Sequence, residues 1–469
     1  MSASTESYDL VVLGGGPGGY VAAIRGGQLN GKVALIEEAG LGGVCLQRGC
    51  VPTKFLLEMA GSLKTMQGWL DSGLFHGRIE PSLSSVMERK DAVIKRLEKG
   101  IEYLLKKNKV HVIRGRGKLI GPNILEVTDR GGEKTQIGAR NVIVATGSRP
   151  LTPQIPGLDE EGVITGEELL DLNEFPKNVV IIGGGPEGVE FAHILHAFGS
   201  KVTVVEMLRQ LLPMEDTEIG IELEKTMSRA GIQVKTGSKV VEVVGPVLQK
   251  KIRLSTDKSI EVTEELEADA VLLAAGRVPN IEGIGLDEMK IRHTRRGIEV
   301  DTRMMTNLPG IYAIGDVAGR FWLAYTASEE GIVASENAMG LTSVAEHRVL
   351  PRCVFTKPEV GAVGLTEQQA KSNGTAVKVG RYSFFANAKG VSTNHNEGLI
   401  KIVAEEGSGL VLGVHILGPD AAELVHAAAL GMFMNVTLDN LSDMLFAHPT
   451  YSEGLREAAL DALGKAIHK

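Results

Sequence analysis

Two cysteines five residues apart, Cys45 and Cys50, have the spacing in this sequence that most directly implies chemistry. In a regular α-helix the Cα atoms of residues i and i+5 lie about 8–9 Å apart, whereas a disulfide needs about 4.4–6.8 Å. A bond between these sulfurs requires the backbone to leave helical geometry, and Gly49 supplies that freedom. Pro52 then suits the first turn of a following helix. A strained disulfide at a helix N-terminus beside Arg48 is easily reduced, so the spacing predicts a redox-active pair with at least one low-pKa thiol.

The alternative is that both cysteines are buried structural thiols, as is usual in the reducing cytosol. The redox interpretation is favoured because a glycine-rich nucleotide loop stands about thirty residues earlier, and a dithiol beside a two-electron carrier has an obvious use. The third cysteine, Cys353, lies in an apolar run over residues 351–355. We expect it to pack in a hydrophobic core.

A strand–glycine turn–helix–strand unit occurs twice along the chain. In each copy an apolar strand enters glycines spaced as G-x-G-x-x-G, and a second strand ends in an acid about twenty residues later. Such glycines let the backbone approach a diphosphate at the helix N-terminus, and the acid accepts from a ribose hydroxyl. Two complete copies predict two bound dinucleotides. The residues are Gly14, Gly16, Gly19 and Glu37 in the first copy, and Gly183, Gly185, Gly188 and Glu206 in the second.

Each copy later returns to a similar strand that ends in Gly and Pro, over residues 141–150 and 270–279. These breaks favour domain boundaries. Residues 55–110 carry long helical patterns, and residues 311–316 form another strand placed to return to the first nucleotide. From about residue 350, strands and helices alternate without a nucleotide fingerprint. The predicted domains are 1–150, 151–280, 281–349 and 350–469.

Length and composition fit a soluble α/β protein of several domains. The chain has 469 residues, too many for one core, with 58 glycines and 43% hydrophobic residues. A net charge of −8 without dense Lys/Arg blocks disfavours nucleic acid as a partner. The first residues lack the basic and apolar regions of a signal peptide, and no apolar run approaches about 20 residues. We therefore expect a cytoplasmic protein without membrane spans.

Together these residues resemble the flavoprotein disulfide reductases over essentially the whole chain, and most closely the members that oxidise dihydrolipoamide with NAD⁺. The resemblance implies two Rossmann-like α/β domains for FAD and NAD, a central domain that completes the FAD site, and a C-terminal α+β dimerisation domain. The matching segments are the two glycine loops with their acids, 43–54, 145–147, 315–316, 327–331 and 447–453.

The resemblance also implies how FAD is held. The first loop would bind its diphosphate, Glu37 its adenosine ribose and Asp316 its ribityl and phosphate groups. Lys54 would lie beside the flavin ring and pair with Glu190; by themselves both are ordinary charged helix residues. The further expected contacts are Gly117, Thr146, Gly147, Ser148, Trp322, Leu323, Ala324 and Tyr325, although Tyr325-Thr326 replaces the usual His-Lys, and Gln47-Arg48 the commoner Asn-Val of the cysteine loop.

The second loop would bind NAD rather than NADP. Glu206 stands where a 2′-phosphate would lie, and one like-charge pair at 4 Å costs about 4 kcal/mol at an effective dielectric of 20. The single nearby Arg209 should not overcome that repulsion. Val240 and Gly276 are weaker candidates for contacts with the adenine and nicotinamide sides.

Among eleven histidines, His448 is the candidate acid–base group. It precedes Pro449, which favours an extended backbone, and Glu453 follows five residues later. A carboxylate bonded to one imidazole nitrogen fixes the tautomer and leaves the other to take a thiol proton. The resemblance places this pair against the disulfide of the other subunit of a homodimer. His193 and His196 share a helix but lack the third ligand that a metal site needs.

The implied reaction is dihydrolipoamide plus NAD⁺ giving lipoamide, NADH and a proton, with the dithiol carried by a lipoyl domain of a 2-oxo acid dehydrogenase or glycine cleavage complex. Glutathione reductase activity is disfavoured because its NADPH site needs basic residues where this chain has Glu206. Mercuric reductase activity is disfavoured because the extra C-terminal cysteine pair is absent. Transhydrogenase and non-catalytic flavin-binding roles are disfavoured because Cys45, Cys50 and His448 are all present.

Overall fold

The computed structural model describes residues 6–256 and 261–468, which form two compact units. The first unit contains residues 6–55, 82–151 and 276–346, and the second contains 56–81, 152–256, 261–275 and 347–468. Each unit is therefore assembled from segments far apart in the sequence. The boundaries between the four predicted domains stay a prediction. Residues 1–5, on which the expectation about a signal peptide partly rests, lie outside the described residues.

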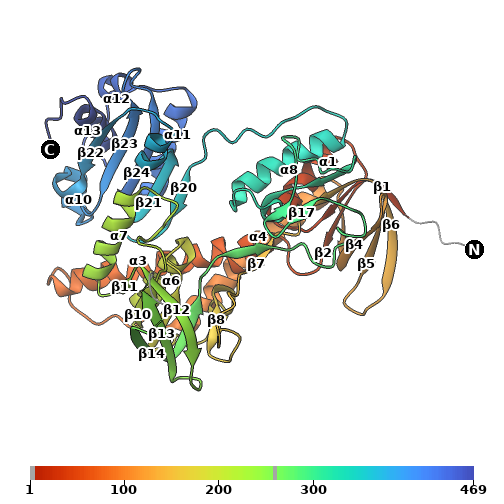
Figure 1. Ribbon diagram of the computed structural model, residues 1–469, viewed down its shortest axis with the longest axis horizontal. Helices are drawn as coiled ribbons and strands as arrows, with labels where there is room; N and C mark the ends of the chain where they lie inside the picture. Colours follow the sequence, from red (N-terminus) through yellow and green to blue (C-terminus); the bar gives the residue numbers. More distant parts are fainter. Residues whose placement is uncertain (1–5, 257–260, 469) are drawn as a thin grey trace, which may run out of the picture. The chain divides into compact units, whose positions relative to one another are not determined.

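A seven-stranded sheet forms the centre of the first unit (Figure 1). Its order is β3-β2-β1-β6-β5-β4, and β19 pairs with β6 in parallel. The β1, β2, β3 and β6 pairings are parallel, while β4 and β5 pair antiparallel. Every residue of β2 is buried, which explains its apolar sequence. The strands are β1 (Ser7–Leu13), β2 (Val33–Glu37), β3 (His111–Arg114), β4 (Arg116–Gly121), β5 (Ile124–Thr128), β6 (Lys134–Val144) and β19 (Ile311–Ala313).

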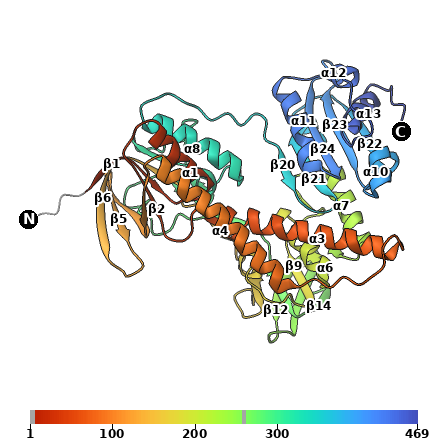
Figure 2. The ribbon, with the colours of Figure 1, turned by 180° about the vertical axis from the view of Figure 1, so that it is seen from behind.

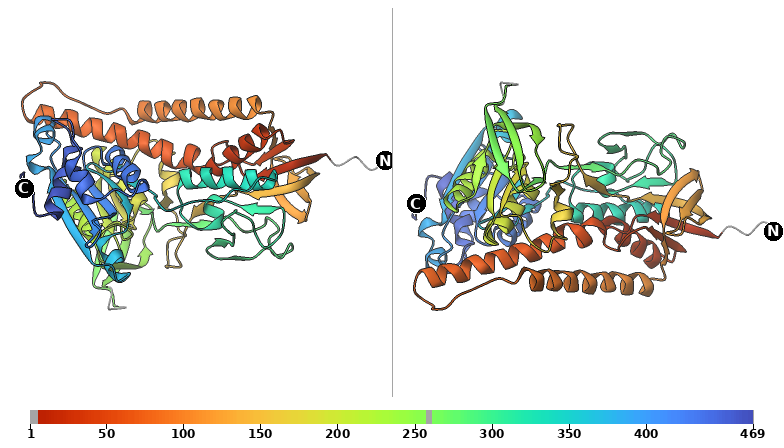
Figure 3. Two further views of the ribbon diagram at one scale, coloured as in Figure 1. Left: turned by 90° about the horizontal axis from the view of Figure 1, so that it is seen from above. Right: turned by 90° about the horizontal axis from the view of Figure 1, so that it is seen from below.

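Two helices of this unit pack closely on each other, α1 (Pro17–Gln28) and α8 (Ala324–Ala338) (Figure 3). Their approach depends on small residues, because a Cβ on Gly331 would lie 2.5 Å from the carbonyl oxygen of Gly18. The helix α4 (Leu83–Lys107) also contacts α1 and begins at Ser82, whose side chain caps it.

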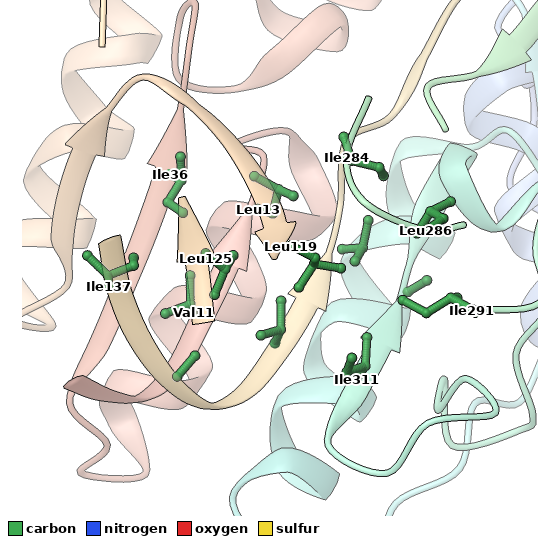
Figure 4. Close-up of a cluster of buried hydrophobic side chains, with 14 of the residues drawn as sticks. Val11, Leu13, Ile36, Leu119, Leu125, Ile137, Ile284, Leu286, Ile291 and Ile311 are labelled. Carbon is green, nitrogen blue, oxygen red and sulfur yellow. The ribbon is translucent and has the colours of Figure 1, made fainter. Parts of the chain in front are cut away.

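A single hydrophobic cluster joins distant parts of the first unit (Figure 4). Side chains of β1, β2, β4 and β5, including Leu13 and Leu119, pack with Ile284, Leu286 and Ile291. The segment after residue 276 thus completes the core of the sheet that carries the first glycine turn.

The second unit repeats the strand–turn–helix–strand device around a parallel five-stranded sheet of order β11-β10-β9-β15-β8. A three-stranded antiparallel sheet, β12-β13-β14, belongs to the same unit. The elements are β8 (Val163–Thr165), β9 (Asn178–Ile182), α6 (Pro186–Ala197), β10 (Lys201–Val205), α7 (Thr217–Arg229), β11 (Gln233–Lys235), β12 (Ser238–Val244), β13 (Lys250–Thr256), β14 (Glu264–Ala268) and β15 (Ala270–Leu273).

The C-terminal part of the second unit is an antiparallel sheet of order β20-β21-β24-β23-β22 (Figure 2). The helix α11 packs on β21 and β24, and α13 packs on β22 and β23. The elements are β20 (Arg352–Val354), β21 (Glu359–Gly364), α9 (Glu367–Ser372), β22 (Val377–Ser383), α10 (Ala388–Thr393), β23 (Leu399–Glu405), β24 (Val411–Gly418), α11 (Ala421–Phe433), α12 (Leu438–Asp443) and α13 (Glu453–Ala462).

The long helix α3 and several short elements complete the described chain. They are α2 (Gly43–Arg48), α3 (Cys50–Asp71), α5 (Gly166–Leu169), the pairs β7 (Ser148–Pro150) with β16 (Arg277–Pro279) and β17 (His293–Thr294) with β18 (Gly297–Ile298), and the 3₁₀ turns η1 (Gly315–Ala318) and η2 (Phe384–Ala386). Among the described residues, no helix combines the length and apolar character that crossing a membrane needs.

Candidate functional site

The first glycine turn lies between β1 and α1 and has the shape that a dinucleotide needs. Gly14 has φ +106°, and a Cβ there would lie 2.3 Å from the carbonyl oxygen of Ala145. A Cβ on Gly19 would lie 1.8 Å from the carbonyl oxygen of Gly14. At Gly16 the nearest atom would be 3.9 Å away, so the turn is open there, at the N-terminus of α1. The turn is thus closed on its strand side and open where a diphosphate would approach the helix.

Glu37, at the end of β2, is held by the turn itself. Its Oε2 accepts from the Gly15 N–H at 2.6 Å and its Oε1 from the Ala39 N–H at 2.7 Å. The Gly42 N–H then donates to the carbonyl of Gly15 at 2.8 Å. The carboxylate is buried and fixed in orientation, and each oxygen keeps a second lone pair for a ribose hydroxyl.

The second glycine turn, between β9 and α6, repeats this geometry. Glu206 accepts from the Gly184 N–H at 2.7 Å and from the Leu208 N–H at 2.7 Å. The Leu212 N–H donates to the carbonyl of Gly184 at 2.9 Å. A Cβ on Gly188 would lie 1.9 Å from the Gly183 carbonyl, whereas one on Gly185 would have no atom within 4 Å. Both turns therefore fit a dinucleotide.

A polar network in the first unit surrounds Asp316, which lies in η1. The Ser148 hydroxyl donates to Asp316 Oδ2 at 2.6 Å, and Arg277 Nε donates to Ser148 Oγ at 2.9 Å. The N–H of Gly315 donates to Glu330 Oε2 at 2.7 Å. Burial raises the pKa of Glu330, whose side chain lies inside the unit on α8. Sequence reasoning missed Arg277 and the role of Glu330, although the motif 327–331 contained the glutamate.

The other predicted FAD residues differ in how they are placed. Thr146 Oγ1 donates to the carbonyl of Asn280 at 2.8 Å, which ties the end of the β6 strand to the segment after 276. Gly147 has φ +71° and no atom within 4 Å of an added Cβ. At Gly117 a Cβ would lie 2.5 Å from Leu13 Cδ1, so a side chain here would have to displace residues of the core.

The segment 322–325 starts α8. Trp322 has φ +60° and is partly exposed, Leu323 is the N-cap residue, and Ala324 and Tyr325 are the first helical residues. The Tyr325 ring is also partly exposed. Both aromatic rings are thus accessible beside the helix N-terminus.

Of the two weaker candidates for NAD contacts, one is open and one is not. Gly276 has φ +109° and open space around it. The Val240 side chain packs in a hydrophobic core with 3% exposure, so only its backbone can face a nucleotide.

The structure brings Cys45 and Cys50 together as predicted. The helix α2 ends at Arg48, Gly49 has φ −140° and ψ −111°, and α3 begins at Cys50. The chain leaves helical geometry at Gly49, and the Cys45 thiol forms a hydrogen bond with Cys50. That hydrogen bond, with burial, raises the pKa of Cys45, while the positive charge of Lys54 opposes the shift. The pKa of Cys45 is thus raised, and the low-pKa thiol expected in this pair stays a prediction.

His448 and Glu453 also form the predicted pair. His448 Nδ1 lies 2.8 Å from Glu453 Oε1, and Glu453 Oε2 accepts from the Thr450 N–H at 2.8 Å. The carboxylate fixes Nδ1 as the protonated nitrogen and leaves Nε2 to exchange a proton. The imidazole is exposed, with 69% of its side chain accessible.

Lys54 and Glu190 lie in different units, and their pairing stays a prediction. Glu190 is buried on α6 and its Oε1 accepts from the Phe355 N–H at 2.9 Å, so it is not a surface charge. On the same helix, burial lowers the pKa of His193 to about 4 and its Nδ1 bonds the carbonyl of Val189, which makes it a neutral core residue. Cys353 is half-buried in β20 and packs against the C-terminal core.

Comparison with known proteins gives a consistent result. Residues 8–331 match the family model described as pyridine nucleotide-disulphide oxidoreductase, and residues 350–459 match the dimerisation domain of the same family. The chain is 40% identical to a dihydrolipoyl dehydrogenase of Bacillus subtilis, over 98% of this chain and 99% of that protein. It is 37% identical to the mitochondrial dihydrolipoyl dehydrogenase of Pisum sativum, over 100% of this chain and 94% of that protein.

Solved structures agree. The flavoprotein disulfide reductase RclA from Escherichia coli superposes with a TM-score of 0.87 at 26% identity, covering 97% of this chain and 99% of that chain. LpdA from Mycobacterium tuberculosis superposes with a TM-score of 0.86 at 28% identity, with the same coverage. The repeated glycine turns, the adjacent cysteines and these matches along the chain have one explanation: this protein belongs to the pyridine nucleotide-disulphide oxidoreductase family.

Proposed function

We propose that the protein oxidises dihydrolipoamide to lipoamide with NAD⁺, using Cys45 and Cys50 as the thiol–disulfide centre. The observation that carries the proposal is the position of the two adjacent thiols. They follow the loop after β2, and the Gly42 N–H of that loop donates to a carbonyl of the first glycine turn. The relatives named dihydrolipoyl dehydrogenase support this substrate.

The cysteines supply the thiol half of the reaction. One substrate thiolate attacks Cys45 of the Cys45–Cys50 disulfide, which breaks the S–S bond and leaves the electron pair on the Cys50 sulfur. The second substrate thiolate attacks the first substrate sulfur, closes the lipoamide disulfide and releases Cys45. Bound FAD and NAD would supply the two-electron acceptors that the reduced cysteine pair needs in order to return to the Cys45–Cys50 disulfide.

His448 manages the protons. The Glu453 carboxylate at 2.8 Å orients the imidazole, so Nε2 takes the proton of the substrate thiol. Because thiolates and not thiols attack disulfides, this proton transfer controls the rate of the first exchange. Glu37 would hold the FAD ribose and Glu206 the NAD ribose. Lys54, Glu190 and Asp316 are further proposed site residues.

We also propose a homodimer in the cytoplasm, serving a lipoyl domain of a 2-oxo acid dehydrogenase or glycine cleavage complex. The match of residues 350–459 to a dimerisation domain supports the dimer. The exposure of His448 supports a site completed by a second chain, because an acid–base group that acted within its own unit would be sheltered.

Anaerobic titration tests the proposal. Dihydrolipoamide should bleach the flavin spectrum of the purified protein, and NAD⁺ should then restore it with formation of NADH. Dihydrolipoamide and a simple monothiol are compared at equal thiol concentration, and the dithiol should react far faster because it closes a ring. A flavin that NADH reduces but dihydrolipoamide does not would contradict this substrate.

A further inference from the structure

We infer that Lys401 is a positioning residue for the nucleotide site of the second unit, acting through Asp216 on the loop that follows Glu206. This inference rests on the proposed function, because it assumes that the second glycine turn binds NAD. It adds residues of the C-terminal sheet to that site, although they lie far from Glu206 in the sequence.

Lys401 is a buried cation in a closed ionic cluster. Its Nζ lies 2.8 Å from Asp216 Oδ1, 2.7 Å from Glu367 Oε2 and 3.2 Å from Glu218 Oε2. The side chains of Lys401 and Asp216 are 2% and 0% exposed. Burial alone would lower the pKa of Lys401, but its hydrogen bonds to Asp216 and Glu367 outweigh burial and raise it. The lysine is therefore charged whenever the protein is folded near neutral pH.

Both carboxylate oxygens of Asp216 accept hydrogen bonds. Oδ1 caps α7 by accepting from the Glu218 N–H at 3.0 Å and also receives Lys401, while Oδ2 accepts from the Glu367 N–H at 3.1 Å. The neighbouring Glu215 is held by Arg352 through two bonds of 2.7 and 2.9 Å. Glu215 and Asp216 thus bind the end of this loop to two strands of the C-terminal sheet, through Arg352 of β20 and Lys401 of β23.

The fastened point is the far end of the nucleotide loop. That loop starts at Glu206, and at Leu212 its N–H bonds the carbonyl of Gly184, the middle residue of the glycine turn. The Glu215 N–H then donates to the Leu212 carbonyl at 2.8 Å. Leu212 has φ +48°, a conformation that an unsupported leucine avoids. The position of Asp216 therefore determines whether Leu212 can hold Gly184, and so the shape of the turn around a diphosphate.

The charge of Lys401 is what makes this anchor stable. Without it, the fully buried carboxylate of Asp216 would lose its ion pair, whereas Glu218 and Glu367 would keep their pairs with Arg381 and Lys371 at the surface. A buried carboxylate that has lost its cation is costly, so the loop end would move toward solvent. We expect the glycine turn of the second unit to loosen and that of the first unit to stay unchanged.

The test compares Lys401→Met with Lys250→Met in the full-length holoenzyme. Lys250 is an equally buried lysine of the same unit, and it pairs with Glu160 at 3.1 Å, away from the loop. Binding of NADH, and of ADP-ribose as the fragment without nicotinamide, is measured by fluorescence or calorimetric titration. Lys401→Met should raise the Kd for NADH and the Kd for ADP-ribose at least tenfold. Lys250→Met should change each Kd by less than twofold. FAD content and the rate of flavin reduction by dihydrolipoamide should stay within twofold in both variants.

Two further variants address folding and mechanism. Asp216→Asn keeps the helix cap but removes the charge, and it should weaken NADH binding several-fold. The double variant should bind no worse than Lys401→Met alone, because both changes act on one cluster. If Lys401→Met does not fold, Asp216→Asn decides the question.

The inference is overturned if the folded variant, Lys401→Met or otherwise Asp216→Asn, binds NADH within twofold of the unaltered protein. It is equally overturned if Lys250→Met weakens binding as much as Lys401→Met does. An unaltered protein that fails to bind NADH would overturn the proposed function itself, so the two failures can be told apart.

Discussion

The N–H of Gly42 donates to the carbonyl of Gly15 at 2.8 Å, so the loop after β2 is fastened to the first glycine turn three residues before Cys45. The helix α2 begins at the next residue, Gly43, and carries Cys45 in its first turn. The Gln47 amide also donates to the Leu41 carbonyl at 2.8 Å, so a backbone bond and a side-chain bond together hold the start of α2 near the nucleotide turn.

This placement predicts different spectra for the two cysteine variants. If Cys50 is the thiolate beside the flavin, Cys50→Ser should abolish the long-wavelength absorbance that accompanies two-electron reduction. Cys45→Ser should leave a thiolate that gives this absorbance without full reduction. Cys353→Ser, half-buried in β20, is the matched control and should behave as the unaltered protein. Survival of the band in Cys50→Ser would show that the roles are reversed.

Selectivity between the two nicotinamide nucleotides should follow Glu206. The carboxylate is fixed by the N–H groups of Gly184 and Leu208, so it cannot swing away from a 2′-phosphate. We expect NAD to be preferred over NADP by at least about two orders of magnitude in kcat/KM, from one like-charge pair worth about 4 kcal/mol. Glu206→Gln should lower the ratio of kcat/KM with NAD to kcat/KM with NADP. Glu161 is exposed, and Glu161→Gln should leave this ratio unchanged. Equal rates with both nucleotides in the unaltered protein would contradict the assignment.

His448→Ala should separate the two half-reactions. Loss of the acid–base group should slow dihydrolipoamide-dependent NAD⁺ reduction by about 10²–10⁴-fold. NADH oxidation by a dye that accepts directly from the flavin bypasses the dithiol and should change little. The exposed His76→Ala provides the control. Steady-state rates with each acceptor measure the effect, and an equal loss in both reactions would mean that His448 has a structural role.

A mixed dimer tests whether the site is shared between chains. One chain carries His448→Ala and the other carries Cys45→Ser. If His448 acts on the cysteines of the partner chain, one working site remains in this mixed dimer. That site combines His448 of the Cys45→Ser chain with the intact cysteine pair of the His448→Ala chain. If the mixed dimer is inactive while the unaltered dimer is active, then either each site lies within one chain or the two sites of the dimer depend on each other.

Acid should destabilise the second unit through Glu367. Hydrogen bonds from Lys371 and Lys401 lower the pKa of Glu367 to about 2, against an ordinary value of 4.5. A carboxyl group with a lowered folded-state pKa stabilises the fold above its unfolded-state value, and this contribution disappears as the pH falls from about 4.5 toward 2. The melting temperature of the unaltered protein should therefore fall steeply below pH 4.5, and that of Glu367→Gln less steeply. Parallel curves for both proteins would show that the cluster does not titrate in this window.

Local patterns were sufficient to predict much of this molecule. The two glycine turns, the break in helix geometry at Gly49 and the His448–Glu453 pair were predicted, because each depends on residues close together in the sequence. The long helical patterns expected over residues 55–110 correspond to α3 and α4, and the alternation of strands and helices expected from about residue 350 corresponds to β20 through α13.

Contacts between distant residues were not predicted. Lys401 and Asp216 are 185 positions apart, and each alone resembles a surface charge on a strand or a helix cap. Glu330 supports Gly315 through a bond that no local pattern contains. Val240 was a weaker candidate for a contact with NAD, but its side chain is buried in a hydrophobic core. Whether a side chain is buried depends on which segments of the chain pack against it. The residue spacing along a single strand does not contain that information.

The pairing of β19 with β6 has a consequence for how the protein is made. β6 ends at Val144, yet its neighbour Ile311–Ala313 emerges from the ribosome only after the whole strand–helix repeat of the second unit has been synthesised. Until then the C-terminal end of β6 presents an unpaired edge of a parallel sheet, the kind of surface on which nascent chains associate wrongly. Truncation after the second repeat should therefore yield an insoluble fragment and not an independent flavin-binding domain.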